Sequence, residues 1–387
     1  MDAGSSAGTR AARADDLYVD TPEALGALTA RLSGTPWVAL DTEFLREKTY
    51  RARLCLLQIS APGIVACIDP LALADLAPLQ QLLLDPAIVK ILHAARQDLE
   101  ILHQLWGRIP MPVFDTQIAA ALLGPADQIG YGRLVADQLG IELDKGHART
   151  DWSRRPLAPA QLHYAADDVR YLGEIYAIQR DALEARGRQA WFEDECRRLG
   201  EPSTYETDPQ DAWLRLKGVY RLQGAQLGAA RALAAWRETE ASRADRPRRW
   251  ILADEPLLDI ARHMPDTPEA LGKIRNLPPS TLRRHGAALI EAAARARAQP
   301  REAWPELPAR PQLDDAQSIL AERLMEMLRR ASESANIAPA MLATRREIER
   351  AATGETDLPV MRGWRAEMLG DELRAFVARA RTAPESP

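Results

Sequence analysis

Short apolar runs with the character of β-strands lie between residues 37 and 115, and no convincing run of this kind follows residue 200. This distribution confines any sheet to the first part of the 387-residue chain. The predicted strands are 37–41, 53–59, 64–68, 88–92 and 113–114. Amphipathic helical patterns lie at 20–33, 71–84, 93–102, 116–123 and 159–177.

The order of these segments predicts an α/β layer fold over residues 20–195. Ala61-Pro62-Gly63 is a turn signal between the second and third runs, so these two runs are expected to form an antiparallel hairpin. Strands and helices then alternate with short connections, which is typical of parallel pairing. We therefore expect a mixed sheet.

Beyond residue 200 the pattern is helical. Glu201-Pro202-Ser203 and the four prolines of residues 300–312 indicate linkers. They separate two expected all-α domains at 210–296 and 312–385. Residues 1–19 contain no apolar core of a secretory signal and are expected to form a disordered tail.

Composition narrows the class of protein. Hydrophobic residues make up 46% and charged residues 27% of the chain, as in soluble globular proteins. No apolar run approaches the length of a membrane span, and three scattered cysteines fit a reducing cytoplasm. Acidic residues outnumber basic ones in 37–176, whereas basic residues dominate 211–300. A positive segment of this kind is typical of a polyanion-binding surface or of solvated helix faces.

Four acidic residues and a tyrosine follow or lie near the predicted strands in positions that could bring their side chains together. Asp41 and Glu43 are two positions apart in an extended segment, so both side chains project to the same side. Asp98 follows the strand at 88–92, and Tyr164 and Asp168 share one face of a helix. Together the four acidic residues supply four negative charges, which would offset two divalent cations such as Mg²⁺ or Mn²⁺. This arrangement suits hydrolysis of a phosphodiester.

Other candidate residues have more than one interpretation. Asp115 is either a further ligand or the cap of the helix beginning near residue 116. His163 is a candidate base or a locally bonded side chain, and His93 is interpreted as a satisfied core histidine. Trp152 and Trp106 are candidates for base stacking or for packing.

The chain resembles the ribonuclease D family, of the tyrosine-bearing branch of the DEDD exonucleases. The resemblance lies in VALDTEFLREKTYRARLCLLQIS (38–60), IDPL (68–71), KILHAARQDLEIL (90–102), FDTQIAAALLG (114–124), LDKGHARTDWSRRPL (143–157) and YAADDVRYL (164–172). The two helical segments resemble HRDC domains, the nucleic-acid-binding modules also found in RecQ-type helicases. The resemblance implies a ribonuclease H-like α/β domain followed by two HRDC-type domains.

The resemblance also implies an activity and residue roles. The expected reaction is 3′–5′ hydrolysis of RNA, with two divalent ions, that releases nucleoside 5′-monophosphates from tRNA precursors and other structured RNAs. Asp41, Glu43 and Asp168 are expected to hold one metal ion, Asp41 and Asp98 the other. Tyr164 is expected to orient the attacking water. A cytoplasmic monomer is expected.

Two alternatives to this function remain open at this stage, a proofreading-type DNA 3′–5′ exonuclease and a non-catalytic RNA-binding protein on the same fold. An RNA-backbone contact is expected outside the catalytic domain, where basic residues flank an aromatic one; a solvated loop is the other interpretation of the same residues. The candidates are Arg243, Arg246, Arg248, Arg249 and Trp250.

Overall fold

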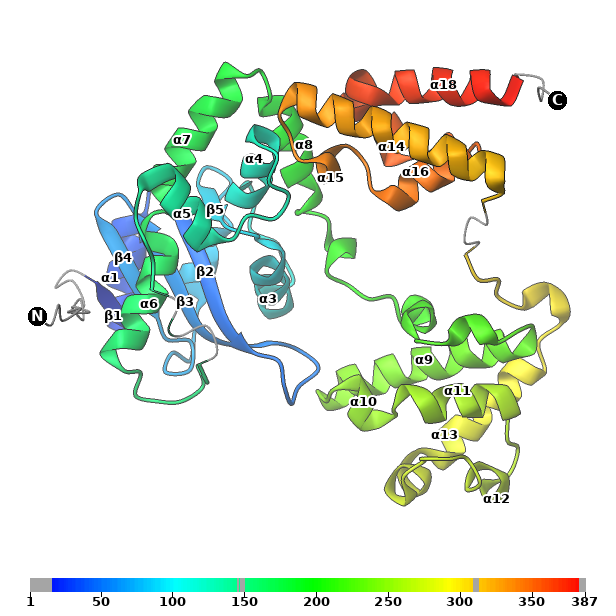
Figure 1. Ribbon diagram of the computed structural model, residues 1–387. Helices are drawn as coiled ribbons and strands as arrows, with labels where there is room; N and C mark the ends of the chain where they lie inside the picture. The colour runs from blue at the N-terminus through cyan, green and yellow to red at the C-terminus, as the bar shows by residue number, and fades with distance from the viewer. Residues whose placement is uncertain (1–15, 145, 147–149, 309–312, 383–387) are drawn as a thin grey trace, which may run out of the picture. The chain divides into compact units, whose positions relative to one another are not determined.

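A computed structural model describes residues 16–144, 146, 150–308 and 313–382 (Figure 1). The chain divides into two compact units. The first comprises residues 1–43, 54–201 and 310–387, and the second comprises residues 44–53 and 202–309.

A six-stranded mixed sheet in the order β1-β4-β3-β2-β5-β6 forms the centre of the first unit. The hairpin strands β3 and β4 pair antiparallel as predicted, whereas β1–β4, β2–β5 and β5–β6 pair in parallel. The strands are β1 (Leu17–Val19), β2 (Trp37–Leu45), β3 (Arg53–Ala61), β4 (Ile64–Ile68), β5 (Val89–Leu92) and β6 (Val113–Asp115). The central strands are buried on both sides, which explains why their sequences are mostly apolar rather than alternating. The buried polar exceptions are Gln58, Ser60 and Lys90.

Helices connect these strands and cover the sheet. Thr21 caps α1, because its hydroxyl accepts a hydrogen bond from the backbone N–H of Ala24. Helices α5 and α6 lie across one face of the sheet in Figure 1. The helices of this part are α1 (Pro22–Leu32), α2 (Ala77–Leu83), α3 (Arg96–Trp106), α4 (Thr116–Leu123), α5 (Tyr131–Leu139), α6 (Pro159–Arg170), α7 (Leu172–Ala185) and α8 (Gln189–Arg198).

The structure corrects one prediction at the N-terminus. Residues 17–19, expected to belong to a disordered tail, form β1 and pair in register from Leu17 with Ala66 to Val19 with Ile68. The Val19 side chain is buried, and its carbonyl accepts a hydrogen bond from the Asp69 N–H at 2.8 Å. A three-residue strand is too short to show any periodicity, so only the pairing partner reveals it. Residues 1–15 of the predicted tail lie outside the described residues.

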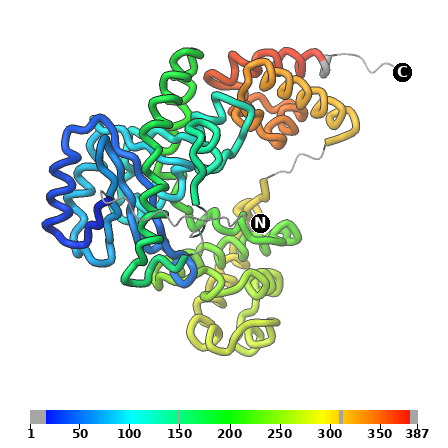
Figure 2. The backbone as a smooth tube through the Cα atoms, turned by 60° about the vertical axis from the view of Figure 1, so that its left-hand side comes forward, coloured from blue at the N-terminus to red at the C-terminus, as the bar shows by residue number. Residues whose placement is uncertain are grey.

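The C-terminal helical segment belongs to the first unit rather than standing alone. The Trp191 ring of α8 stacks on Trp364, with ring centroids 4.8 Å apart and planes within 14°. Arg365 forms a bidentate ion pair with Glu195, in which both side chains are about nine-tenths buried. Figure 2 shows the orange and red helices beside the green α7 and α8. The helices are α14 (Asp315–Ala335), α15 (Pro339–Leu342), α16 (Arg345–Ala352), α17 (Gly363–Arg365) and α18 (Asp371–Thr382), with a π-helical turn at Ala366–Gly370.

The second unit is a helical bundle in which α9 packs against α11 and α13. Buried alanines of α9 let the neighbouring backbones approach closely, and leucines from the other helices fill the core. The helices are α9 (Ala225–Ala244), α10 (Arg248–Ile251), α11 (Asp254–His263), α12 (Pro268–Leu271) and α13 (Pro279–Arg297). Across the described part of the chain, no helix is both long and apolar enough to cross a bilayer.

Candidate active site

The strand β2 and the helix α6 bring three carboxylates together. Asp41 and Glu43 alternate with the buried Thr42 along β2, so they project to one side of the sheet. Asp168, far along the chain from Glu43, approaches them from α6. One carboxylate oxygen from each of the three residues lies within 4.8 Å of the others. The sequence prediction that Asp41, Glu43 and Asp168 meet at one place is confirmed.

The helix α6 is held on the sheet near these carboxylates. The Ser60 hydroxyl of β3 donates a hydrogen bond to the Val169 carbonyl at 2.8 Å, in a buried position. Helix α6 also packs on β4. The backbone that carries Asp168 is therefore fixed by contacts on the sheet side of the helix.

Asp98 lies beside this group rather than within it. It is in the first turn of α3, is 7% exposed, and accepts a hydrogen bond from the Thr42 hydroxyl at 2.5 Å. Its negative charge is one of the causes that raise the pKa of Asp41, which places the two carboxyls close together. Thr42 is a site residue that the sequence did not reveal. It lies on the side of the strand opposite to Asp41 and Glu43, and no local pattern around a threonine indicates that it will bond to a distant carboxylate.

The cluster is electrostatically unbalanced. Burial, together with the charges of Asp168 and Asp98, raises the pKa of Glu43 to about 8. Burial, followed by the charge of Asp167, raises the pKa of Asp168 to about 7. Burial and the three neighbouring carboxylates also raise the pKa of Asp41 well above its usual range. Close carboxylates of this kind retain protons at neutral pH unless positive charge is supplied.

The donor set therefore fits divalent cations. Carboxylate oxygens are the ligands that Mg²⁺ and Mn²⁺ prefer, and the excess negative charge is what such ions would neutralise. Asp98 has a pKa raised to about 6, because burial outweighs the hydrogen bond from Thr42. All four carboxyls thus share the property that protonation competes with cation binding.

Tyr164 faces the carboxylates from α6, one turn before Asp168. Burial raises the pKa of its phenol, and the charges of Asp168, Glu43 and Asp41 raise it further. The hydroxyl therefore stays protonated at physiological pH and is able to donate a hydrogen bond. The phenol lies where the sequence predicted, beside the three clustered carboxylates.

Contacts in the structure decide between the alternative roles that the sequence left open for Asp115, His93, His163 and Trp152. Asp115 caps α4, because its carboxylate accepts hydrogen bonds from two backbone N–H groups at the start of that helix. It also accepts from the N–H groups of residues 94 and 95, just before α3, a second role that the sequence did not reveal. His93 contacts Thr116 and the Ile129 carbonyl through its two ring nitrogens, and His163 pairs locally with Asp167. Trp152 is 2% exposed, so it packs rather than stacks on bases.

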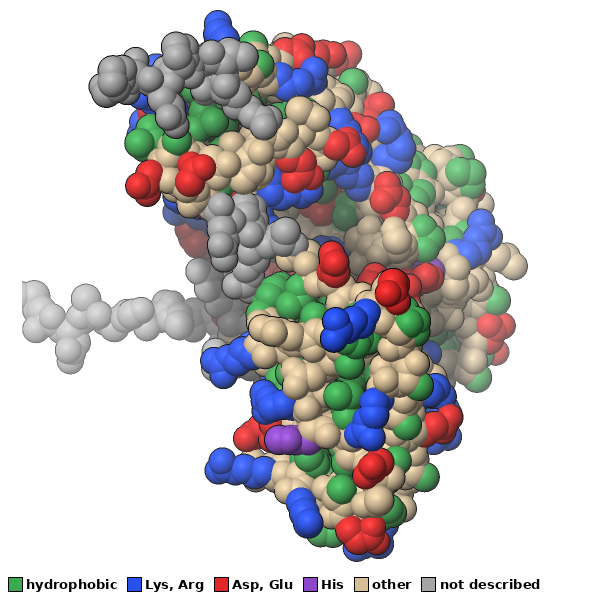
Figure 3. Space-filling view, turned by 90° about the vertical axis from the view of Figure 1, so that its right-hand side faces the viewer, with side chains coloured by type: hydrophobic (Ala, Val, Ile, Leu, Met, Phe, Trp, Pro, Cys, Tyr) green, Lys and Arg blue, Asp and Glu red, His purple; other side chains and the backbone are tan. Residues whose placement is uncertain are grey.

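The predicted RNA contacts lie in the second unit. Arg243 pairs with Glu240, Arg248 with Glu238, and Arg249 with Asp254. Trp250 is 61% exposed. These ion pairs partly neutralise the basic residues, whose role in RNA binding stays a prediction. Basic and acidic side chains are also interspersed on the face of the second unit that the lower part of Figure 3 shows.

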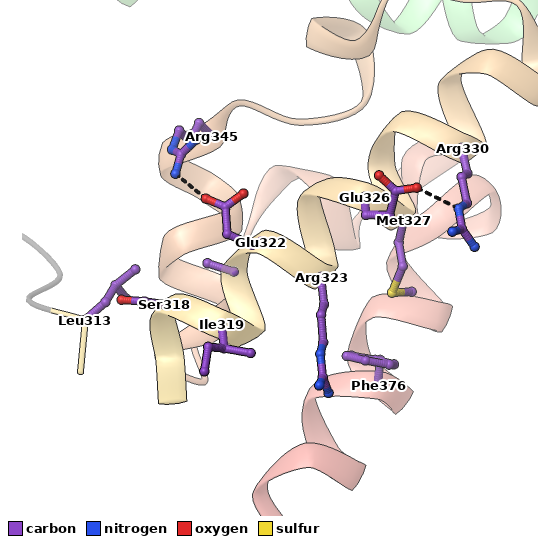
Figure 4. Close-up of a pocket in the computed structure, with 11 residues that line it drawn as sticks. Leu313, Ser318, Ile319, Glu322, Arg323, Glu326, Met327, Arg330, Arg345 and Phe376 are labelled. Carbon is purple, nitrogen blue, oxygen red and sulfur yellow. Dashed lines mark hydrogen bonds and ion pairs between the residues drawn. The ribbon is translucent and has the colours of Figure 1, made fainter. Parts of the chain in front are cut away.

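A groove on the C-terminal helices contains none of the predicted site residues. Its walls come from α14, α16 and α18, and its acidic side chains pair with arginines, Glu322 with Arg345 and Glu326 with Arg330 (Figure 4). Apolar side chains such as Ile319 and Phe376 complete the lining. With its carboxylates neutralised, this groove lacks the chemistry of the cluster on β2.

Comparisons with known proteins relate the chain to exonucleases. The sequence model of a family described as 3′-5′ exonuclease matches residues 17–184, and that of the HRDC domain matches residues 226–292. A ribonuclease D of Granulibacter bethesdensis is 43% identical over 358 residues, covering 92% of this chain and 90% of the relative. A ribonuclease D of Acidiphilium cryptum is 40% identical and covers 92% of each.

A solved structure extends the likeness to the whole fold. The crystal structure of Escherichia coli RNase D, described as an exoribonuclease involved in structured RNA processing, superposes with a TM-score of 0.84 at 33% identity. The match covers 94% of this chain and 98% of that one. The HRDC match confirms one of the two expected HRDC domains and does not reach residues 313–382.

Proposed function

The chain belongs to the ribonuclease D family and is a 3′–5′ exoribonuclease, and from this premise we propose how its residues carry out the reaction. The observation that supports the proposal is the cluster of Asp41, Glu43 and Asp168, with Asp98 adjacent. Two divalent ions bound there would lower the pKa of a water molecule and stabilise negative charge on the leaving 3′ oxygen.

The residues of the chain have distinct tasks in this proposal. Asp41 would contact both ions, because the charges of Asp98, Asp168 and Glu43 all raise its pKa, which places its carboxyl close to the other three. The Tyr164 hydroxyl would hold the attacking water by a hydrogen bond. Thr42 would fix the orientation of Asp98 through its short hydrogen bond.

The position of cleavage determines the product. Attack on the last phosphodiester with a leaving 3′ oxygen releases a nucleoside 5′-monophosphate. We propose tRNA precursors and other structured RNAs with 3′ tails as substrates, and the E. coli relative supports this proposal only as far as structured RNA. Residues 313–382 would form a second HRDC-type module, for which the helical content is the support.

The test uses a 3′-tailed RNA, with wild type, Asp41→Ala and the exposed-site control Asp127→Ala. We expect wild type and the control to release nucleoside 5′-monophosphates in Mg²⁺ or Mn²⁺ and to stop when a chelator is added. Asp41→Ala should be inactive while its circular dichroism spectrum is unchanged. Activity retained by Asp41→Ala would refute the assignment of the site.

A matched DNA oligonucleotide addresses the remaining alternative. A ribonuclease reads the 2′-hydroxyl, so the RNA should be degraded faster than the DNA. Equal or faster degradation of the DNA would favour the proofreading-type exonuclease instead.

A further inference from the structure

Two sequence segments that the carboxylate site does not use, 68–71 and 150–157, meet in the structure. Asp69 follows β4 directly and is 2% exposed. Arg155, 86 residues further along, forms a bidentate ion pair with it, with Nε at 2.5 Å from Oδ2 and Nη2 at 2.7 Å from Oδ1. Burial alone would raise the pKa of Asp69, but hydrogen bonds from Arg155 and Tyr18 hold it below its usual value.

The guanidinium of Arg155 also binds backbone carbonyls. Nη2 donates to the Cys55 carbonyl of β3 at 2.6 Å, and Nη1 donates to the Trp152 carbonyl at 2.8 Å and to the Arg154 carbonyl at 2.9 Å. Every donor hydrogen of the guanidinium thus has an acceptor. The Asp69–Arg155 pair ties the irregular segment around residue 152 to the sheet.

Trp152 of that segment packs beside the ring of Tyr164. The Trp152 side chain is 2% exposed, and its ring centroid lies 6.3 Å from that of Tyr164, with 31° between the planes. This separation is within the range of offset aromatic packing. Helix α6 itself is held by the Ser60 hydrogen bond and by packing on β4. The contact with Trp152 restricts the side chain of Tyr164 rather than the backbone of α6.

We propose that Asp69 and Arg155 are positioning residues for the reaction, because they hold Trp152 against Tyr164 and so fix the phenol beside the carboxylates. The inference rests on the proposed role of Tyr164. It assigns no contact with RNA or metal to Asp69 or Arg155. Their effect on catalysis should pass through Tyr164 alone.

A double-mutant cycle in full-length protein tests this route. Arg155→Lys keeps the charge but loses the planar fork, because an ammonium group has three donors at one point. We expect its kcat on a 3′-tailed RNA to fall about tenfold, within the loss that small misplacements cause, with KM changed less than about twofold. In a Tyr164→Phe background the same substitution should lower kcat less than about twofold, because the hydroxyl it positions is gone.

Two further measurements separate positioning from general disruption. Mn²⁺ affinity measured by calorimetry should be unchanged in Arg155→Lys, because Asp168 is held by contacts that do not involve the pair. The matched control is Arg154→Lys, whose side chain is 84% exposed and pairs with Asp151 on the surface. It should leave kcat, KM and Mn²⁺ affinity unchanged. If Arg155→Lys folds poorly, Trp152→Phe, which keeps an aromatic ring, replaces it in the test. We expect the same fall in kcat and the same unchanged Mn²⁺ affinity from Trp152→Phe.

The outcomes distinguish this inference from the function on which it rests. An equal loss of kcat in both backgrounds, no loss at all, or weakened Mn²⁺ binding in both Arg155→Lys and Trp152→Phe would overturn the positioning role while leaving Tyr164 in place. If Tyr164→Phe had wild-type kcat, both the water-orienting role and the positioning pair would be wrong. The metal-binding carboxylates would still be tested separately by Asp41→Ala.

Discussion

Neutralising Glu43 should stabilise the metal-free protein and remove its activity. In the folded state burial and neighbouring carboxylates raise the pKa of Glu43 from 4.5 to about 8. A carboxyl with a raised pKa costs no stability below about pH 4.5, where it is protonated in both states. The cost grows as pH rises and is complete above about pH 8. The amide introduced by Glu43→Gln has no charge to desolvate at any pH.

The size of the effect follows from the two pKa values. At about 1.4 kcal/mol per pKa unit, the complete cost is about 5 kcal/mol, of which about 3 kcal/mol is present at pH 7 and about 1 kcal/mol at pH 5. When Glu43 is charged, neighbouring carboxyls retain protons, and this reduces the cost of its charge. We therefore expect Glu43→Gln to raise the free energy of unfolding by about 1–3 kcal/mol at pH 7. In a protein of 387 residues that is an increase in Tm of about 1–4 °C.

Calorimetry of metal-free wild type and Glu43→Gln between pH 5 and pH 8 measures this difference. The control Glu142→Gln changes an exposed carboxylate and should shift stability by less than about 0.5 kcal/mol. Added Mn²⁺ should stabilise wild type more than Glu43→Gln, because it binds the folded state of the intact site better. A stability difference that is absent, or that does not grow with pH, would refute the electrostatic reasoning.

Three other predictions concern the site and the C-terminal helices. Tyr164→Phe should lower kcat but retain Mn²⁺ binding by calorimetry, since it removes a hydroxyl and no charge; loss of metal binding would contradict the assigned role. Mn²⁺ affinity should rise from pH 6 to pH 8, and binding should release protons. The reason is that the cation displaces protons from carboxyls with raised pKa values, about 7 for Asp168 and about 8 for Glu43. An affinity that does not change with pH would contradict metal binding by these carboxyls. Arg365→Met should destabilise the first unit by about 3 kcal/mol in denaturant unfolding, because it leaves the buried Glu195 charge poorly paired, whereas an unchanged midpoint would show that the pair is dispensable.

Much of the site follows from patterns that are local in the chain. The alternation of β2 places Asp41 and Glu43 on one side, and the helical spacing of α6 places Tyr164 and Asp168 on one face. The hairpin of β3 and β4 follows from two apolar runs and a glycine turn. Each of these depends only on the repeat of a strand or a helix, so the sequence was sufficient to predict it.

Long-range pairing was decided by the tertiary structure. The bond from Thr42 to Asp98 and the fork from Arg155 to Asp69 join residues that are 56 and 86 positions apart in the chain. The stacking of Trp364 on Trp191 joins segments that are farther apart still. Nothing in the local sequence around any of these residues specifies its partner, because each contact forms only when the strand order and the helix packing bring the two segments together.

Sequence patterns were therefore sufficient for most of the elements around the site and for the direction in which the carboxylates of β2 and α6 point, since both depend on the short repeat of a strand or a helix. They were not sufficient for β1, α5 or α8. The three-dimensional arrangement alone decided how those carboxylates are supported, and that the C-terminal helices share a compact unit with the catalytic sheet. Both of these outcomes depend on contacts between distant segments, which exist only after the elements have packed.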